Sequence, residues 1–206
     1  MQSRLSQLVL KSIEEAPRLY QDKIRFIAAF DSSYIRGNQC AVVVIYDLSR
    51  GNIIEKEFAI EQVNVPYMPG FLAFREIPGY MRAYSKLHVE PDLVLVDGHG
   101  LAHPRSFGIA SHLGLVLDKP SIGIAKHKLY GEIIHGDQAL YIYAHGRKIG
   151  VILRHMNTDL YVSIGYKIRL EDAVDIVKKL LVEGKKLPIP LQEADEYSKT
   201  IKNKYC

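Results

Sequence analysis

The segment Pro91–Lys126 (PDLVLVDGHGLAHPRSFGIASHLGLVLDKPSIGIAK) constrains the fold more than any other part of the chain. Its run Leu93–Val96 is entirely aliphatic and too short for a typical helix, which indicates a strand buried on both faces. Asp97 follows this run directly, and open α/β sheets keep their functional groups at the carboxyl ends of their strands. The segment therefore predicts an α/β fold that presents a carboxylate at a sheet edge.

An aspartate after a strand can also serve simply as the N-cap of the next helix. Here the six residues Gly98–His103 separate Asp97 from Pro104, and the apolar spacing typical of a helix begins only near Phe107. A capping residue stands directly before its helix. The spacing therefore favours a carboxylate that faces a ligand.

The remaining segments predict short strands and amphipathic helices in an α/β order. Strands are expected at residues 24–30, 40–46, 53–60, 93–96, 121–125, 140–145, 148–154 and 160–164. Helices are expected at residues 5–13, 71–87 with an interruption at Pro78-Gly79, 107–116, 170–182 and 191–202. A three-stranded meander followed by helix, strand, helix and strand is the ribonuclease H-like arrangement. It has a mixed five-stranded central sheet flanked by helices, here with extra strands and helices.

Composition limits what this fold can be used for. A chain of 206 residues that is 48% hydrophobic is expected to form one domain, residues 1–206, with a sizeable core. No apolar run approaches the roughly 20 residues that span a bilayer, and the start is not a signal peptide, so a cytoplasmic protein is expected. The two cysteines, Cys40 and Cys206, suggest neither a disulfide framework nor a thiolate zinc site. The net charge of +4 permits an anionic partner without demanding one.

The acids form a pattern within this predicted topology. Asp31 follows the first strand as Asp97 follows the fourth, so both carboxylates reach one edge if these strands are parallel neighbours. Two acids at one edge repel each other unless a cation lies between them, and Mg²⁺ prefers such oxygen ligands. Glu76 can add a third carboxylate. Asp92, at the other end of the fourth strand, is expected to be a solvated turn residue. Taken singly, Asp31 or Glu76 could equally be an ordinary surface acid, since most carboxylates are exposed. Together, in this topology, the acids predict a two-metal phosphodiester site.

Four motifs carry a resemblance to a known family. FDSSY (Phe30–Tyr34), PYMPGFLAFRE (Pro66–Glu76), VDGHGLAHPRSFGIASHLG (Val96–Gly114) and SIGIAK (Ser121–Lys126) resemble, in order and spacing, the motifs of endonuclease V, the deoxyinosine-specific repair nuclease. The resemblance runs from about Ile24 to Lys202 and covers nearly the whole chain.

The resemblance implies a Mg²⁺-dependent endonuclease, with Mn²⁺ also accepted, that nicks DNA at the second phosphodiester bond 3′ to inosine. The expected ends are a 3′-hydroxyl and a 5′-phosphate. It assigns metal binding to Asp31, Glu76 and Asp97, charge neutralisation at the leaving oxygen to Lys126, and a place near the phosphate to His103. Asp195 stands where many relatives have a histidine near the metal. Because aspartate also binds Mg²⁺ well, Asp195 is assigned as a further metal ligand.

The resemblance also implies a lesion-binding region. Tyr67 matches the aromatic wedge of a stiff loop, with Pro66 and Pro69 beside it and Met68 keeping it apolar. Glycines at positions such as Gly70 and Gly98 let the backbone approach a flipped base. The residues Leu72, Gly100 and Gly123 are assigned to the same role, whereas Tyr166 is expected to be structural.

Three functions stay open from the sequence. The first is the inosine-directed DNA endonuclease, acting as a monomer on DNA and not at a membrane. The second has the same fold but cuts inosine in RNA, since the 2′-hydroxyl alone separates the two polymers at a given site. The third is a silent nucleic-acid-binding relative, which the presence of Asp31, Glu76, Asp97 and Lys126 disfavours.

Overall fold

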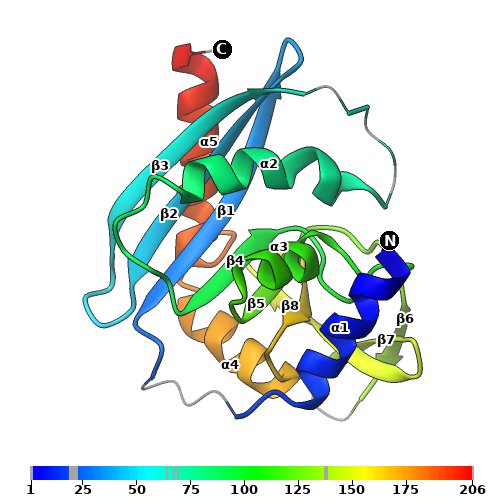
Figure 1. Cartoon of the computed structure of the whole chain (residues 1–206). Helices are drawn as coiled ribbons and strands as arrows, with labels where there is room; N and C mark the ends of the chain where they lie inside the picture. Colours follow the sequence, from blue (N-terminus) through cyan, green and yellow to red (C-terminus); the bar gives the residue numbers. More distant parts are fainter. Residues whose placement is uncertain are drawn as a thin grey trace.

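The computed structural model describes residues 2–18, 23–63, 65–66, 68, 70–136 and 139–205 (Figure 1). The strands are β1 (Phe26–Ile35), β2 (Asn38–Asp47), β3 (Asn52–Gln62), β4 (Leu93–Asp97), β5 (Ser121–Ala125), β6 (Glu132–His135), β7 (Leu140–Ala144), β8 (Arg147–His155) and β9 (Thr158–Tyr166). The helices are α1 (Gln2–Glu14), α2 (Leu72–Tyr84), α3 (Ile109–Leu117), α4 (Leu170–Leu180) and α5 (Ile189–Tyr205).

Five strands form the central sheet that the sequence predicts. β3, β2 and β1 make an antiparallel meander, and β1 then pairs in parallel with β4, which pairs in parallel with β5. The parallel register sets Phe30 of β1 opposite Val96 of β4. The residues that follow these two positions, Asp31 and Asp97, therefore emerge at the same level of the sheet.

The sheet does not stop at β5. Within the described residues it has nine strands in the order β3-β2-β1-β4-β5-β9-β8-β7-β6. β9 pairs antiparallel with β5, and β8, β7 and β6 continue the sheet outward. β6 was not predicted, because the four residues of Glu132–His135 are all exposed and lack an alternating apolar pattern. One sheet joins all the described strands, and the single domain over residues 1–206 stays a prediction.

Helices cover the two faces of the central sheet, because alternate strand residues point to opposite sides. On one side, Ala28 and Phe30 pack with residues of α2 and α3. On the other side, Ile27 and Ala29 pack with residues of α1, α4 and α5. α2 and α3 lie on the near face of the sheet in Figure 1. Among the described helices, none is long and apolar enough to cross a membrane.

Two local expectations about secondary structure were wrong. β1 does not end before Asp31 but continues to Ile35, because its antiparallel pairing with β2 runs on after the parallel pairing with β4 has stopped. α2 is not interrupted at Pro78-Gly79. Its residues Ile77 and Tyr80 are buried in the core, and this packing outweighs the backbone hydrogen bond that the proline cannot donate.

Asp92 also differs from the expected solvated turn residue. It lies at the opposite end of β4 from Asp97, as predicted, but its Oδ2 accepts hydrogen bonds from the backbone N–H groups of Arg25 and Phe26, both at 2.9 Å. It therefore fixes the chain at the beginning of β1.

Candidate active site

Asp31 and Asp97 form the centre of a cluster of carboxylates. They lie at the sheet edge where the parallel pairing of β1 and β4 ends. Asp31 is buried, at 8% exposure, and Asp97 is half-buried. The Ser198 hydroxyl of α5 donates a hydrogen bond to Asp31 Oδ2 at 2.8 Å. Burial is the main reason that the pKa of Asp31 rises from 3.8 to about 6, and the negative charge of Asp97 adds to the rise.

Glu76 adds a third carboxylate from α2. Its side chain is buried, and its two oxygens each accept a hydrogen bond from a tyrosine hydroxyl: Oε1 from Tyr34 at 2.8 Å and Oε2 from Tyr80 at 2.9 Å. Burial raises the pKa of Glu76 from 4.5 to about 7 despite these two donors, and the charges of Asp31 and Asp97 raise it further. Burial and the neighbouring carboxylates thus raise the pKa values of both Asp31 and Glu76.

This cluster predicts an unusual dependence of stability on pH. The folded protein holds the proton of Glu76 up to about pH 7, whereas the unfolded chain releases it near pH 4.5. The folded state therefore binds more protons between these values, and stability falls as the pH rises through that window. Glu76→Gln keeps a side chain of similar shape without the charge. In a chelating buffer it should be more stable than wild type at pH 8, by roughly 1–3 kcal/mol.

The difference in stability between Glu76→Gln and wild type should disappear near pH 4, where both proteins are neutral at this position. Urea denaturation at pH 4, 6 and 8 measures the difference. If Glu76→Gln were less stable than wild type by the same amount at all three pH values, the charge of Glu76 would not be what destabilises the folded protein at high pH.

Lys126 follows β5 and brings a positive charge to the cluster. Its Nζ lies 3.0 Å from Asp97 Oδ2. Burial alone would lower the pKa of Lys126, but the carboxylate of Asp97 outweighs burial and the pKa is raised. The ammonium group therefore stays protonated beside the carboxylates.

Asp195 lies on α5 at the border of the cluster. Its carboxylate pairs with Lys199 one helical turn away. The charge of Asp195 nevertheless contributes to the raised pKa values of both Asp31 and Lys126. The structure thus brings together the four predicted acids and Lys126.

A divalent cation fits the chemistry of these donors. Within the described ranges, no three acidic, histidine or cysteine side chains are arranged as a ready-made metal site. The oxygen donors are nevertheless those that Mg²⁺ and Mn²⁺ prefer. Burial is the main reason for the raised pKa values of Asp31 and Glu76, and a cation would relieve the repulsion between carboxylates that adds to it.

A cavity of about 210 Å³ lies beside the cluster. Gly70, Leu72 and Gly98, all assigned to lesion binding from the sequence, line it. Gly98 has a φ of +152°, and a Cβ there would lie 2.5 Å from a side-chain carbon of Ile109. Glycine at position 98 therefore keeps this cavity open.

His103 lines the same cavity and does not face the carboxylates. Its Nε2 lies 3.2 Å from the carbonyl oxygen of Gly70, which can only accept, so Nε2 carries the proton. Its Nδ1 accepts from the backbone N–H of Arg105. Burial lowers the pKa of His103 to about 4, and the charge of Arg105 lowers it further. A neutral His103 holds the loop at Gly70 in place, and its predicted role at the phosphate stays a prediction.

Other lesion-binding predictions have different outcomes. Gly100 and Gly123 do not line the cavity but allow close backbone packing, since a Cβ at Gly123 would lie 2.6 Å from the carbonyl oxygen of Gly98. Pro66 and Met68 are exposed. Tyr67 and Pro69 lie outside the described residues, and the wedge stays a prediction. Tyr166 is structural as expected, because its hydroxyl donates to Asp118 at 3.0 Å.

Several site residues were not predicted from the sequence. Tyr80 stands four residues after Glu76 on α2, a spacing that brings two side chains together on a helix, so this partner could have been found. Tyr34 and Ser198 gave no such signal, since they reach the cluster only through the tertiary fold. The cavity is also lined by Ala73, His99, Phe107, Gly108, Ile109, His127, Lys128 and Leu129.

Buried acids and a lysine at the edge of a ribonuclease H-like sheet, beside a cavity, define a nuclease of that fold class. The family model described as endonuclease V matches residues 7–196. Endonuclease V of Desulfurococcus amylolyticus is 45% identical over 201 residues, covering 97% of this chain and 92% of that protein. The chain belongs to the endonuclease V family.

Solved structures agree with this assignment. The crystal structure of endonuclease V from Bacillus subtilis is 29% identical, with a TM-score of 0.85, and the match covers 97% of this chain and 91% of that one. The Ciona intestinalis endonuclease V, solved with a 24mer DNA containing an inosine followed by a ribo-adenosine, has the same fold. It is 23% identical with a TM-score of 0.83, and the match covers 98% of this chain and 95% of that one.

Proposed function

We propose that this protein nicks a nucleic acid strand at the second phosphodiester bond 3′ to deoxyinosine, leaving a 3′-hydroxyl and a 5′-phosphate, and that it acts as a monomer. The observation that carries the proposal is the placement of the glycine-lined cavity directly beside the carboxylates. Gly98 follows Asp97 directly in the sequence, and His127 follows Lys126. Because Gly98 and His127 both line the cavity, the cavity is adjacent to the carboxylates and the lysine. The inosine-containing DNA in the Ciona structure supports this choice of substrate.

Asp31 and Asp97 would hold Mg²⁺ or Mn²⁺, with Glu76 and Asp195 contributing to the negative charge that attracts the ion. When bound, such an ion supplies activation of the attacking water and neutralisation of charge on the phosphate. The cation preference follows from the all-oxygen donors of this cluster.

The residues of the chain have distinct tasks in this reaction. Lys126 keeps its positive charge where negative charge develops on the leaving oxygen. Tyr34 and Tyr80 hold the two oxygens of Glu76 in a fixed orientation. Neutral His103 and charged Arg105 both donate to the carbonyl oxygen of Gly70, at 3.2 and 2.8 Å, and so fix the loop that lines the cavity at Gly70.

The cavity would receive the flipped hypoxanthine base. Gly70 and Gly98 line the cavity without a side chain, so a base can approach their backbone closely. Hypoxanthine has a carbonyl and a ring N–H where adenine has an amine and a ring nitrogen. A closely fitted cavity with fixed backbone groups can discriminate between them, because the wrong base leaves buried polar groups unpaired.

Leu72→Ala tests the fit of the cavity. Loss of the leucine side chain should loosen the wall and lower the preference for inosine over adenine by about tenfold or more. The ratio of kcat/KM for two duplexes that differ only at this base measures the preference. A uniform fall in both rates would place Leu72 outside base recognition.

The substrate assay itself is direct. Labelled DNA and RNA strands carrying a single inosine are incubated with Mg²⁺, Mn²⁺ or a chelator, and the products are sized to the nucleotide. We expect a single metal-dependent cut 3′ to inosine in DNA. Cutting of the RNA strand alone would favour the alternative endoribonuclease, and binding without cutting would indicate the silent relative.

A further inference from the structure

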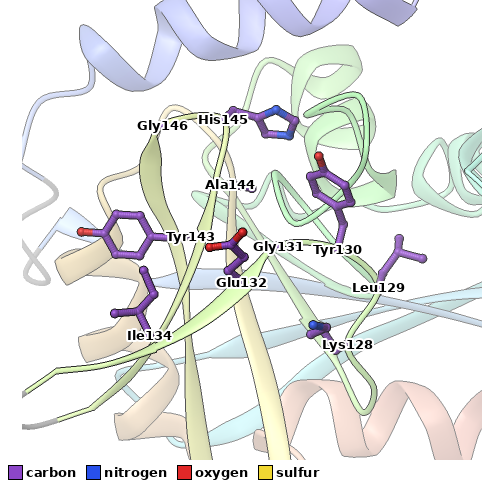
Figure 2. A pocket seen from close by; sticks show the side chains of 10 residues that line it. All are labelled: Lys128, Leu129, Tyr130, Gly131, Glu132, Ile134, Tyr143, Ala144, His145 and Gly146. Atoms are coloured by element: carbon purple, nitrogen blue, oxygen red, sulfur yellow. The ribbon is translucent and has the colours of Figure 1, made fainter.

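A second cavity, of about 570 Å³, lies on the hairpin of β6 and β7 (Figure 2). Glu132 on β6 stands directly opposite Tyr143 on β7, and both line the cavity together with Ile134. Alternation along the strand turns Ile142, the neighbour of Tyr143, to the buried core on the other face. One face of this hairpin thus anchors it to the protein, and the other forms the cavity.

Two aromatic rings form one end of the cavity. The rings of Tyr130 and His145 are stacked, with centroids 5.3 Å apart and planes at 23°. Figure 2 shows them next to each other, with Lys128 below Tyr130 in the view. Nε2 of His145 lies 3.1 Å from the backbone carbonyl oxygen of His103 and donates to it. The ring pair is therefore held in place, although Tyr130 keeps 38% of its surface exposed.

This cavity adjoins the cavity of about 210 Å³ beside the carboxylates, which is called the lesion cavity from here on. Lys128 and Leu129 line both, whereas the larger cavity shares no lining residue with the carboxylate cluster. Along the loop after β5, the chain passes from Lys126 at the carboxylates, through the lesion cavity, to Tyr130 at the larger cavity. A strand that lies along this loop would therefore place the cut bond at one side of the lesion and the larger cavity at the other.

We propose that the larger cavity binds the nucleotide on the 5′ side of inosine, with its base stacked on Tyr130. The inference rests on the proposed cleavage 3′ to inosine, which assigns the 5′ neighbour to the far side of the lesion cavity. Base stacking on an exposed aromatic ring tolerates any sequence. The ammonium group of Lys128 suits the phosphate of this nucleotide.

A double-mutant cycle between protein and DNA tests this subsite. Wild type and Tyr130→Ala each cut two inosine duplexes under single-turnover conditions: one intact, and one with an abasic analogue immediately 5′ to inosine. With enzyme below saturation, removing the base should slow the wild type by about 5- to 150-fold, the size of one stacking contact. It should slow Tyr130→Ala by less than about twofold, because the stacking partner is already gone.

Controls separate the possible failures. Tyr130→Phe keeps the ring and should retain the wild-type dependence on the 5′ base. Tyr205→Ala removes another exposed tyrosine, at the far end of α5 (Figure 1), and should also retain it. Equal sensitivity of wild type and Tyr130→Ala to the abasic analogue would overturn the subsite and leave the proposed function intact. Failure of wild type to cut the intact inosine duplex would overturn both, and thermal melts of each variant exclude loss of folding.

Discussion

Asp97→Ala is expected to abolish strand cleavage while binding of inosine-containing DNA stays within about tenfold of wild type. The carboxylate lies at the edge of β4 beside Asp31 and Lys126, outside the lining of the lesion cavity. Its loss should therefore prevent the cleavage step without changing recognition of the inosine base. Asp31→Ala should behave in the same way. Single-turnover cleavage and equilibrium binding of the same duplex measure the two effects.

Asp159→Ala provides a matched control. Asp159 pairs with Arg154 on the surface of β8 and β9 and is 42% exposed in its side chain. Its replacement should leave both cleavage and binding unchanged. A wild-type cleavage rate for Asp97→Ala in Mg²⁺ would remove Asp97 from the active site. Loss of binding in parallel with cleavage would indicate a folding defect or a direct role in holding the lesion.

The second large effect is expected at Lys126. Lys126→Met should slow single-turnover cleavage by ~10²–10³, the size expected when one donor that stabilises developing charge is lost. The methionine keeps the apolar stem and removes only the charge. Folding should hardly change, because the side chain of Lys126 is 41% exposed.

β5 offers a control lysine at its other end. Lys119 stands before the strand and pairs with Glu90, as Lys126 stands after it and pairs with Asp97. Lys119→Met should cut at the wild-type rate. If Lys126→Met also retained that rate, with only a shallower salt dependence of binding, Lys126 would be a solvated surface residue.

Local patterns in the sequence were sufficient to predict the central sheet and the place of its acids. The aliphatic runs before Asp31 and Asp97 form parallel neighbours, so two residues far apart in sequence meet at one edge. The order of elements around them was also correct, and the strand Ser121–Ala125 has the predicted bounds. Short buried strands are recognisable because their whole length is apolar.

Features that depend on distant partners were not predictable in this way. β1 extends beyond Asp31 only because β2 is available to pair with it. α2 stays intact at Pro78 because its flanking residues are buried against the sheet. The hydrogen bond of His103 to the carbonyl oxygen of Gly70 arises only when two loops fold against each other, and its predicted role at the phosphate stays a prediction. The secondary-structure propensities of residues and the periodicity of the sequence give no information about contacts between distant segments.

Anomalous diffraction from crystals of the protein grown with Mn²⁺ and an uncleavable inosine-containing duplex tests the active site most directly. We expect a manganese peak bound by the carboxylates of Asp31 and Asp97, with the hypoxanthine base in the cavity lined by Gly70 and Gly98. A manganese ion at other residues, or an inosine that remains stacked in the duplex away from that cavity, would contradict the proposed site.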